Sequence, residues 1–211
     1  MATIAVVDYG MGNLKSVSKA LMHVAPNHNV MVTDDAKTIQ NADRVVFPGQ
    51  GAMPDCMHEL VARGLRDVVI ESAKSKPFLG ICIGLQMLFE HSEEGDTAGL
   101  GLLSGQVKRF ANPLMDAQGE KLKVPHMGWN IVTQTKQHAL WSGIENANRF
   151  YHVHSYYAAP ANTALETAYS EYPARFTTAV GIDNIFAVQF HAEKSANAGL
   201  QILRNFIDWQ P

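Results

Sequence analysis

The sequence predicts an α/β protein with a mostly parallel central sheet, helices on both faces, and an antiparallel or mixed extension in its second half. Three observations carry this prediction. Apolar, β-branched runs alternate with helical patterns from Thr3 to His91, as expected for right-handed strand–helix–strand crossovers. From Gly99 onward, short alternating runs separated by turn signals replace the helical patterns. An amphipathic helical pattern returns only at the end of the chain.

The first two predicted strands are each followed by a helix. Thr3–Asp8 is a β-branched run that ends at Tyr-Gly, which is typical of a buried parallel strand. Apolar residues at helical spacing then predict a helix over 14–24 with Asn13 as its N-cap. His28–Thr33 is the second strand, and the run DDAKTIQNA after it predicts a short helix with acidic residues in its first turn.

The third and fourth predicted strands continue the alternation. Arg44–Gly49 ends in a sharp Pro-Gly break, and the helical pattern that follows over Asp55–Ser75 should break near Gly64. Pro77–Ile81 predicts the fourth strand and Leu85–His91 the helix after it. Strands that alternate with helices in this way imply a parallel sheet covered on both faces.

The second half of the chain has the pattern of strands. Six runs are expected to pair in antiparallel or mixed fashion, namely Val107–Phe110, Asn130–Thr135, Arg149–His154, Thr163–Tyr169, Thr177–Ile182 and Ile185–Gln189. Ala111–Lys123 predicts a surface loop or hairpin. The last helix covers Ala196–Trp209, and its inward face is formed by Leu200, Leu203, Phe206 and Ile207.

Composition limits the class of protein. The 211 residues are 46% hydrophobic and 18% charged, which suits one domain over residues 1–211; two smaller domains are the alternative. A formal net charge of −3 without a basic run disfavours nucleic acid or an anionic membrane as the main partner. The sequence shows no leader peptide, no membrane-spanning run and no CxxC pairing of Cys56 with Cys82, so we expect a cytoplasmic protein with free thiols.

Three motifs carry weaker hypotheses. Gly10-Met11-Gly12 opens a helix as in dinucleotide-binding folds, but Lys15 replaces the third glycine, which favours a plain strand-to-helix turn. His152 and His154 would share one face of a strand and could bind zinc, but no third ligand lies at a sensible spacing. The segment VPHMGWN around His126 is costly to order for packing alone, although a structural turn explains it equally well.

Cys82 is the strongest candidate for a nucleophile. The stretch GICIG over 80–84 has the G-x-S-x-G spacing of a nucleophile elbow, with cysteine in place of serine. Side chains two positions to either side of such a corner would clash, so glycine occupies both positions. The corner side chain itself then projects at the carboxyl end of the sheet, where α/β folds bind ligands. The start of a helix there would favour the thiolate over the thiol. The alternative is a buried cysteine in an ordinary turn, as we expect for Cys56, which has no flanking glycines.

Two further segments could complete a site around Cys82. His191 and Glu193 lie two apart at the end of a predicted strand, so the carboxylate could orient the imidazole toward the thiol. Glycines flank Gln50 just after the third strand, where backbone amides can approach an oxyanion together with the N–H of Ile83. All three segments follow the carboxyl ends of predicted strands, so we expect them to converge.

In this order, the motifs resemble those of class I, triad-type glutamine amidotransferases over essentially the whole chain. GICIGLQ resembles the nucleophile motif of that family, VQFHAEKS its His-x-Glu motif and FPGQGA its oxyanion strand. The resemblance implies a flavodoxin-like sheet and the release of ammonia from glutamine through a thioester, with no cofactor or metal ion. It assigns the site as follows: Cys82 as nucleophile, His191 as proton carrier, Glu193 as its orienting group, and Gln50, Gly51 and Ile83 as oxyanion donors.

The resemblance also implies substrate and partner residues. It places Gly49, Gln86, His154, Ser155 and Tyr156 around the bound glutamine. DYGMGNLKSV, VPHMGWN and VHSYY resemble the branch of the family that passes ammonia to a cyclase, a β/α barrel, in histidine synthesis. The surface toward this heterodimer partner would include Asn13, Pro125, His126, Met127, Gly128, Trp129, Asn130 and Lys194, with the tryptophan as an anchor.

Two positions depart from the family pattern. Ala192 replaces the proline that usually follows the histidine, which removes a rigid φ but no functional group. Gln50 replaces a common valine, and the sequence leaves the orientation of its peptide open. The alternative functions are another class I amidotransferase subunit, a cysteine hydrolase on the same fold, or a non-catalytic binding subunit. The intact triad and Gln86 argue against the last of these.

Overall fold

Five adjacent parallel strands form the centre of the fold in the computed structural model, which describes residues 1–211. Their order is β2-β1-β3-β4-β15, and each neighbouring pair is parallel. This order is that of doubly wound, flavodoxin-like sheets, which confirms the predicted fold class. The elements of this part are β1 (Thr3–Val7), α1 (Leu14–Val24), β2 (Asn29–Thr33), α2 (Ala36–Asn41), β3 (Arg44–Gly49), α3 (Met53–Ala62), α4 (Arg66–Ser75), β4 (Phe78–Cys82), α5 (Ile83–Gln86), β15 (Ile185–Val188) and α6 (Ala196–Asp208).

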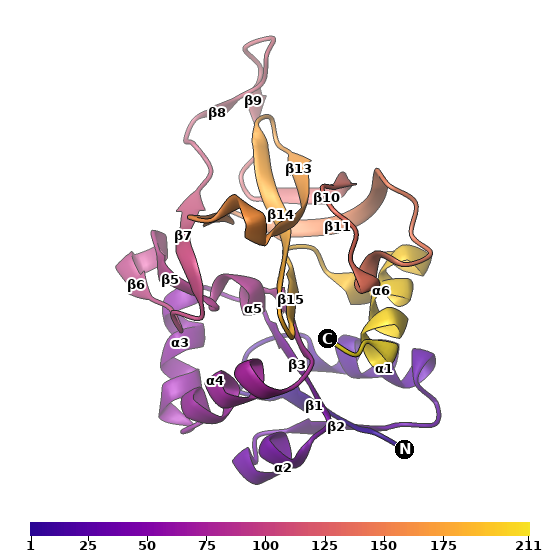
Figure 1. Cartoon of the computed structure of the whole chain (residues 1–211). Helices are drawn as coiled ribbons and strands as arrows, with labels where there is room; N and C mark the ends of the chain where they lie inside the picture. Colours follow the sequence, from indigo (N-terminus) through magenta and orange to yellow (C-terminus); the bar gives the residue numbers. More distant parts are fainter.

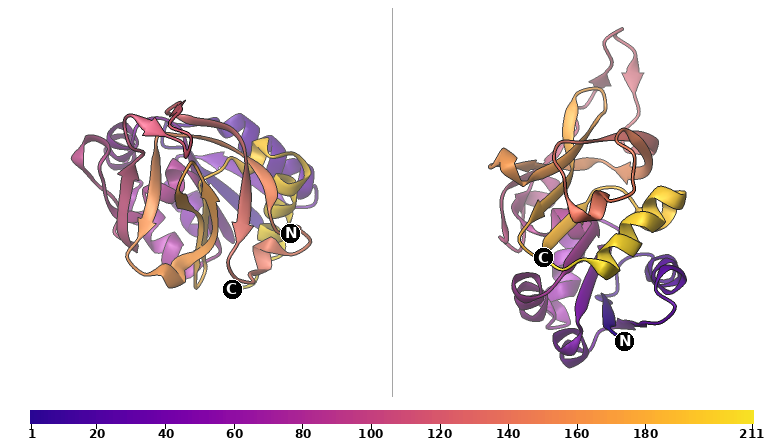
Figure 2. Two further views of the ribbon diagram at one scale, coloured as in Figure 1. Left: turned by 90° about the horizontal axis from the view of Figure 1, so that it is seen from above. Right: turned by 45° about the vertical axis from the view of Figure 1, so that its right-hand side comes forward.

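Strands β1, β3, β4 and β15 are mostly apolar and buried because both faces of the sheet are covered, whereas the edge strand β2 is partly exposed (Figure 1). On β1, Ile4 and Val6 pack in the core formed with α1 and α6. Ala5 and Val7 face the other way, into the core formed with α2, α3 and α4. Two further views show the same separation of the helices (Figure 2). The alternation of side chains along a strand thus distributes one apolar run between two helical layers.

The predicted helix boundaries in the first half are confirmed where capping residues define them. The Asn13 side chain accepts a hydrogen bond from the N–H of Ser16 at 3.3 Å and begins α1. The Asp35 side chain accepts one from the N–H of Thr38 at 2.8 Å and begins α2 as its N-cap, so the acidic residues precede the first turn of this helix and do not lie within it as predicted. The predicted break near Gly64 separates α3 from α4, and Gly64 has the positive φ of +68° that glycine tolerates.

The prediction of a helix over Leu85–His91 is wrong. The helix after β4 is a single turn that ends at Gln86, and Phe89–Ser92 forms strand β5 instead. Strand β5 pairs in parallel with β7 (Leu103–Arg109), and Gly99 packs closely against the carbonyl of Phe89. Ile83, Leu85 and Met87–Phe89 are all buried, so this stretch is apolar on every side and its periodicity does not distinguish helix from strand.

The second half continues the sheet with mostly antiparallel strands, as predicted. Its path from β15 is β14-β12-β7-β5-β6, with β13 on β14 and the pair β10–β11 beyond β13. The remaining bounds are β6 (Thr97–Ala98), β8 (Leu114–Met115), β9 (Lys121–Leu122), β10 (His126–Gln134), β11 (Asn148–His154), β12 (Tyr156–Pro160), β13 (Glu166–Glu171) and β14 (Arg175–Ile182), with short 3-10 turns at Glu94–Asp96, Ala139–Trp141, Thr163–Leu165 and Ala192–Lys194.

Three details of this half differ from or refine the prediction. Strand β12 has no counterpart among the predicted strands. The segment expected to be a loop or hairpin carries the hairpin β8–β9, which projects at the top of Figure 1. On α6, Leu203 and Phe206 are buried as predicted, but Leu200 is half-buried and Ile202 takes its place in the core. No helix combines the length and the apolarity that a membrane span requires.

Candidate active site

Cys82 occupies a strained corner between β4 and α5. Its φ of +57° and ψ of −111° lie outside the regions that side-chain-bearing residues favour. A Cβ at Gly84 would lie 1.9 Å from the carbonyl oxygen of Phe47, and one at Gly80 would lie 2.9 Å from the Cβ of Ala187. The two glycines are therefore required by close approach of neighbouring strands, as the elbow spacing predicts.

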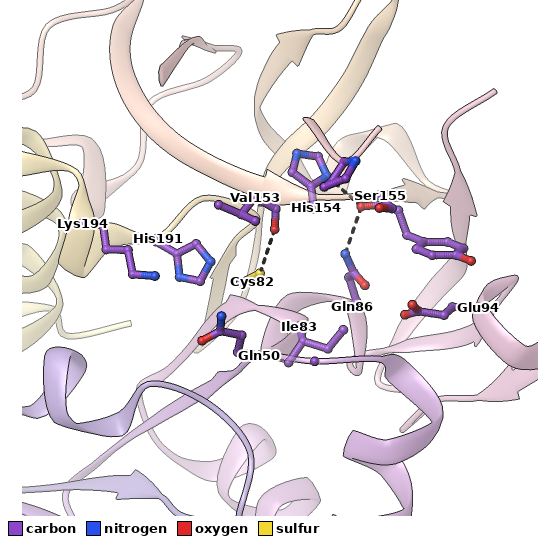
Figure 3. Close-up of a pocket in the computed structure, with 13 residues that line it drawn as sticks. Gln50, Cys82, Ile83, Gln86, Glu94, Val153, His154, Ser155, His191 and Lys194 are labelled. Atoms are coloured by element: carbon purple, nitrogen blue, oxygen red, sulfur yellow. Dashed lines mark hydrogen bonds between the residues drawn. The ribbon is translucent and has the colours of Figure 1, made fainter. Parts of the chain in front are cut away.

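The three predicted segments meet at the carboxyl edge of the central sheet. Strand β4 lies between β3 and β15, and Gly49 at the end of β3 pairs with Cys82 at the end of β4. His191 follows the end of β15 by three residues. In the close-up, His191 lies beside Cys82 and Gln50 lies below it (Figure 3). Adjacency of the strands therefore brings together residues that are far apart in the sequence.

His191 and Glu193 form a buried pair. The Nδ1 atom of His191 lies 2.9 Å from Oε1 of Glu193, and their side chains are 6% and 2% exposed. Burial lowers the pKa of His191, but the hydrogen bond and charge of Cys82, together with those of Glu193, outweigh it and raise this pKa to about 10. The imidazolium form of His191 is therefore favoured, and the carboxylate of Glu193 accepts the Nδ1 proton.

The sulfur of Cys82 has two other polar neighbours. Nε2 of Gln189 lies 3.8 Å from Sγ, and the carbonyl oxygen of Val153 lies 4.0 Å away. Gln189 is fully buried and was not among the predicted site residues, although it stands in the same VQFHAE stretch as His191. α5 is only one turn long, so the helix dipole predicted at Cys82 is that of a single turn.

The loop after β3 presents backbone amides next to Cys82. Gly51 has a φ of +126°, and the N–H groups of Gln50 and Gly51 make no hydrogen bond within the protein. The carbonyl of Gln50 points toward the buried Sγ of Cys56, 3.9 Å away. A Cβ at Gly49 would collide with the hydroxyl of Tyr9 and with the side chain of Ile83. Gly49 thus acts through its lack of a side chain, while Gln50 and Gly51 reach the cavity.

A cavity of about 300 Å³ opens over Cys82. Most of the predicted triad, oxyanion and substrate residues line it; Gly49 and Glu193 lie behind its wall. Glu94 also lines it, and sequence reasoning missed this residue because it lies in a short turn without a motif. Its Oε2 accepts a hydrogen bond from the N–H of Met53 at 2.8 Å. The lining residues are Gln50, Gly51, Cys82, Ile83, Gln86, Glu94, Pro125, Val153, His154, Ser155, Tyr156, His191 and Lys194.

The residues predicted to face a partner are not all at the surface. Met127 and Trp129 on β10 are 62% and 45% exposed. His126 on the same strand is buried and Asn130 is half-buried, so both side chains are directed inward. Gly128 is half-buried between them with a positive φ of +141°.

The other predicted partner residues lie around the mouth of the cavity. Asn13 is exposed at the start of α1. It follows Gly12, where a Cβ would lie 3.2 Å from the Cα of Gly49. Pro125 and Lys194 line the cavity itself. Gly12 therefore packs against the loop after β3, and a Cβ at Gly10 would meet the side chain of Arg63, so close packing accounts for both glycines without a dinucleotide.

Comparison with known proteins gives consistent results. The family model described as "Glutamine amidotransferase class-I" matches residues 5–209. A chain from Dechloromonas aromatica named imidazole glycerol phosphate synthase subunit HisH is 65% identical, over 99% of this chain and 97% of its own. The chain of the same name from Aromatoleum aromaticum is 63% identical, over 100% of both chains.

Solved structures share the fold at low sequence identity. One is a glutamine amidotransferase with a TM-score of 0.71 and 15% identity, covering 97% of both chains. Another is the glutaminase domain of Trypanosoma brucei CTPS with bound acivicin, with a TM-score of 0.64 and 16% identity, covering 100% of this chain and 96% of its own. At these identities the likeness concerns the arrangement of the sheet and helices.

Proposed function

Because the chain belongs to the class-I glutamine amidotransferase family, we propose that it is the glutaminase subunit of an imidazole glycerol phosphate synthase. In this role it hydrolyses L-glutamine to glutamate and ammonia, and it supplies the ammonia to a partner cyclase in histidine biosynthesis. The observation that carries the proposal is the buried Cys82–His191–Glu193 arrangement on a strained elbow. The names of relatives at 63–65% identity support the assignment to this branch of the family.

The first half of the reaction forms a thioester. The Cys82 thiolate attacks the side-chain amide carbon of glutamine, so a C–S bond forms and the carbonyl oxygen becomes an oxyanion. The N–H groups of Ile83 and of Gln50 or Gly51 stabilise that oxyanion. His191, protonated by virtue of its raised pKa, donates its proton to the leaving nitrogen. The C–N bond then breaks, and ammonia leaves a γ-glutamyl thioester.

The second half regenerates the enzyme. Neutral His191 takes a proton from water, which attacks the thioester carbon through a second oxyanion. The C–S bond breaks, glutamate leaves, and the proton held on His191 restores the imidazolium beside the thiolate. Glu193 keeps the imidazole in one orientation in both halves, since its contact to Nδ1 leaves Nε2 for the reacting atoms.

Groups around the cavity suit the rest of the substrate. Glutamine carries an α-ammonium group, and the carboxylate of Glu94 offers it the only acidic side chain of the cavity lining. Gln86, Ser155 and Tyr156 supply polar atoms on the same wall. We assign these residues to glutamine binding together with His154, which acts through its hydrogen bonds, and Gly49, which leaves room for the loop.

The partner we propose is a cyclase of the HisF type, a β/α barrel that forms a heterodimer with this chain. The exposed side chains of Met127, Trp129 and Ile131 on β10 provide an apolar face next to the cavity. Asn13, Pro125, Gly128 and Lys194 complete this face, and His126 and Asn130 stabilise it from within. No cofactor or metal ion enters the proposed chemistry.

Glutamate release from glutamine, measured with and without a cyclase of this type, tests the function. We expect low activity alone, stimulation by the cyclase, and loss of activity in Cys82→Ala. Retained binding of the cyclase by Cys82→Ala is the control that the variant is folded. Unchanged glutamate release by Cys82→Ala would contradict the mechanism, and turnover of esters or peptides but not of glutamine would indicate a cysteine hydrolase.

A further inference from the structure

Three histidines form a buried cluster beside the active site, and the reaction uses none of them as an acid or base. His126, His152 and His154 are 4%, 0% and 6% exposed. The rings of His126 and His152 stack with centroids 5.1 Å apart, and His126 also stacks on Tyr172 at 4.1 Å. Burial of an imidazole without hydrogen-bond partners is unfavourable, so the contacts of this cluster require an explanation.

The hydrogen bonds of His154 and His126 have a fixed direction. Nδ1 of His154 lies 2.8 Å from the carbonyl oxygen of Tyr156 and must donate to it. Burial, followed by the neighbouring His126, lowers the pKa of His154 to about 3, so its Nε2 carries no proton and accepts. Nδ1 of His126 lies 3.0 Å from that Nε2 and therefore donates. Burial lowers the pKa of His126 to about 4, so its own Nε2 accepts in turn.

Asn130 supplies the hydrogen-bond donor for Nε2 of His126. Its Nδ2 lies 3.2 Å from Nε2 of His126. The orientation of the amide is fixed by two other contacts, because Oδ1 accepts from the N–H of Ile131 at 2.7 Å and Nδ2 donates to the carbonyl of Glu171 at 2.9 Å. Each group therefore donates toward Tyr156, and the same assignment of donors and acceptors results whether it is derived from Tyr156 or from Asn130.

The inner end of this chain of hydrogen bonds reaches the candidate active site. The carbonyl of Tyr156 also accepts a hydrogen bond from Nε2 of Gln86 at 3.0 Å (Figure 3). The same nitrogen donates to Oε1 of Gln189 at 3.0 Å, and Nε2 of Gln189 lies 3.8 Å from the sulfur of Cys82. Both hydrogens of the Gln86 amide are thus engaged, which leaves its oxygen as the group free to meet a ligand.

The outer end lies on β10, the strand with the exposed apolar side chains. His126 of β10 pairs with His154 of β11 in the register, and Trp129 pairs with Tyr151. The carbonyl of Tyr151 accepts a hydrogen bond from the N–H of His191 at 2.9 Å. Strand β10 is therefore joined to the cavity by side chains through His126 and by backbone through β11.

From this geometry we propose that His126 and His154 are positioning residues, which hold the Tyr156 carbonyl and the Gln86 amide in place from strand β10. The inference rests on the proposed function only in naming glutamine as the ligand. A variant that cuts the chain at His126 leaves every group of the triad in place. Its effect should therefore fall on glutamine affinity and KM, with kcat at saturating glutamine largely preserved.

His152 provides a matched control within the same cluster. It is equally buried, but its hydrogen bonds go to the carbonyl of Phe150 at 3.1 Å and to the hydroxyl of Thr178 at 2.9 Å. Neither the Phe150 carbonyl nor the Thr178 hydroxyl is hydrogen-bonded to Tyr156 or Gln86, and Thr178 reaches Gln189 only through its backbone carbonyl, which accepts from the N–H of Gln189 at 2.8 Å. His152→Phe therefore removes a buried imidazole and its hydrogen bonds without cutting the chain.

Calorimetric titration of glutamine in the Cys82→Ala background measures binding without turnover. In that background we expect His126→Phe to raise the Kd for glutamine about tenfold, the effect of one lost buried hydrogen bond. His126→Asn should stay within about threefold, since an asparagine amide can place a donor near the position of Nδ1. His152→Phe should stay within about twofold. If His126→Phe does not fold, Asn130→Ala, which removes the outermost donor, is expected to weaken binding about fivefold.

Equal effects of His126→Phe and His152→Phe on the Kd, or no effect of either, would overturn the positioning role. An unchanged Kd in Asn130→Ala, used in place of an unfolded His126→Phe, would overturn it as well. Steady-state kinetics in the Cys82-containing protein give the second readout: a raised KM with unchanged kcat is expected, and a fall in kcat alone would contradict the inference. Absence of glutamine binding to the Cys82→Ala protein itself would instead refute the proposed function.

Discussion

Acid should destabilise this fold by a defined amount, because His152 and His154 must stay neutral in the folded protein. Burial, followed by the charges of neighbouring histidines, lowers the pKa of His154 to about 3 and that of His152 well below its ordinary value of 6.5. In the unfolded chain both groups bind a proton as the pH falls through about 6.5, whereas the folded protein does not. The contribution of these two neutral histidines to the free energy of unfolding is therefore fully present above about pH 6.5 and decreases as the pH falls below it. Between pH 7.5 and pH 5.5 each of the two residues should lower the free energy of unfolding by about 1.4 kcal/mol, or by about 3 kcal/mol for the pair.

Urea unfolding followed by tryptophan fluorescence at pH 7.5 and at pH 5.5 measures this loss. In His152→Phe one of the two groups is absent, so the loss between the two pH values should shrink by about 1.4 kcal/mol, whatever the absolute stability of the variant. His126, His138 and His191 contribute to both proteins and largely cancel in the comparison. If the two proteins lost the same free energy of unfolding within about 0.3 kcal/mol, the assignment of His152 as a buried neutral histidine would be refuted.

Three other changes have defined outcomes. Glu193→Gln removes the charge that faces His191 at 2.9 Å, so kcat for glutamine hydrolysis should fall roughly ten- to a hundredfold in steady-state assays, and an unchanged kcat would exclude an orienting role. Trp129→Ala removes a 45% exposed anchor, so the Kd for the cyclase should rise about thirtyfold by titration with an unchanged Tm; unchanged affinity would place the interface elsewhere. Ala192→Pro should raise the free energy of unfolding in urea by about 0.5–1 kcal/mol, because the backbone of His191 is extended and the N–H of Ala192 makes no hydrogen bond. A lower free energy of unfolding would show that the proline ring does not fit at this position.

Local sequence signals predicted the parts of the fold that depend on local chemistry. The Asn13 cap and the break at Gly64 each reflect a backbone requirement within a few residues, and the glycines around Cys82 follow a known motif spacing; the structure has all three. The prediction of a helix over Leu85–His91 failed because residues 85–89 are all buried and give no periodicity, so the strand Phe89–Ser92 depends on pairing with β7. Pairing between distant segments leaves no trace in the local pattern.

The same distinction applies to the site. Cys82 and His191 could be found because their motifs carry glycines or a fixed spacing that chemistry explains. Gln189 contacts the sulfur and Glu94 lines the cavity, yet neither has a local signal that separates it from an ordinary polar residue. The inward direction of His126 follows from the register of β10 on β11, which sequence periodicity alone does not specify.

The two cysteines show how much the surroundings decide the role of a thiol. Cys56 is fully buried, as expected for a core residue, and burial raises its pKa to about 11, so it remains a thiol that can donate to the Gln50 carbonyl. In a trans peptide the carbonyl of Gln50 and the N–H of Gly51 point in opposite directions. Because the Gln50 carbonyl lies toward Cys56, the Gly51 N–H lies on the opposite side of the same peptide. In this structure the peptide that the sequence left open therefore has its carbonyl on the side of the thiol that does not react.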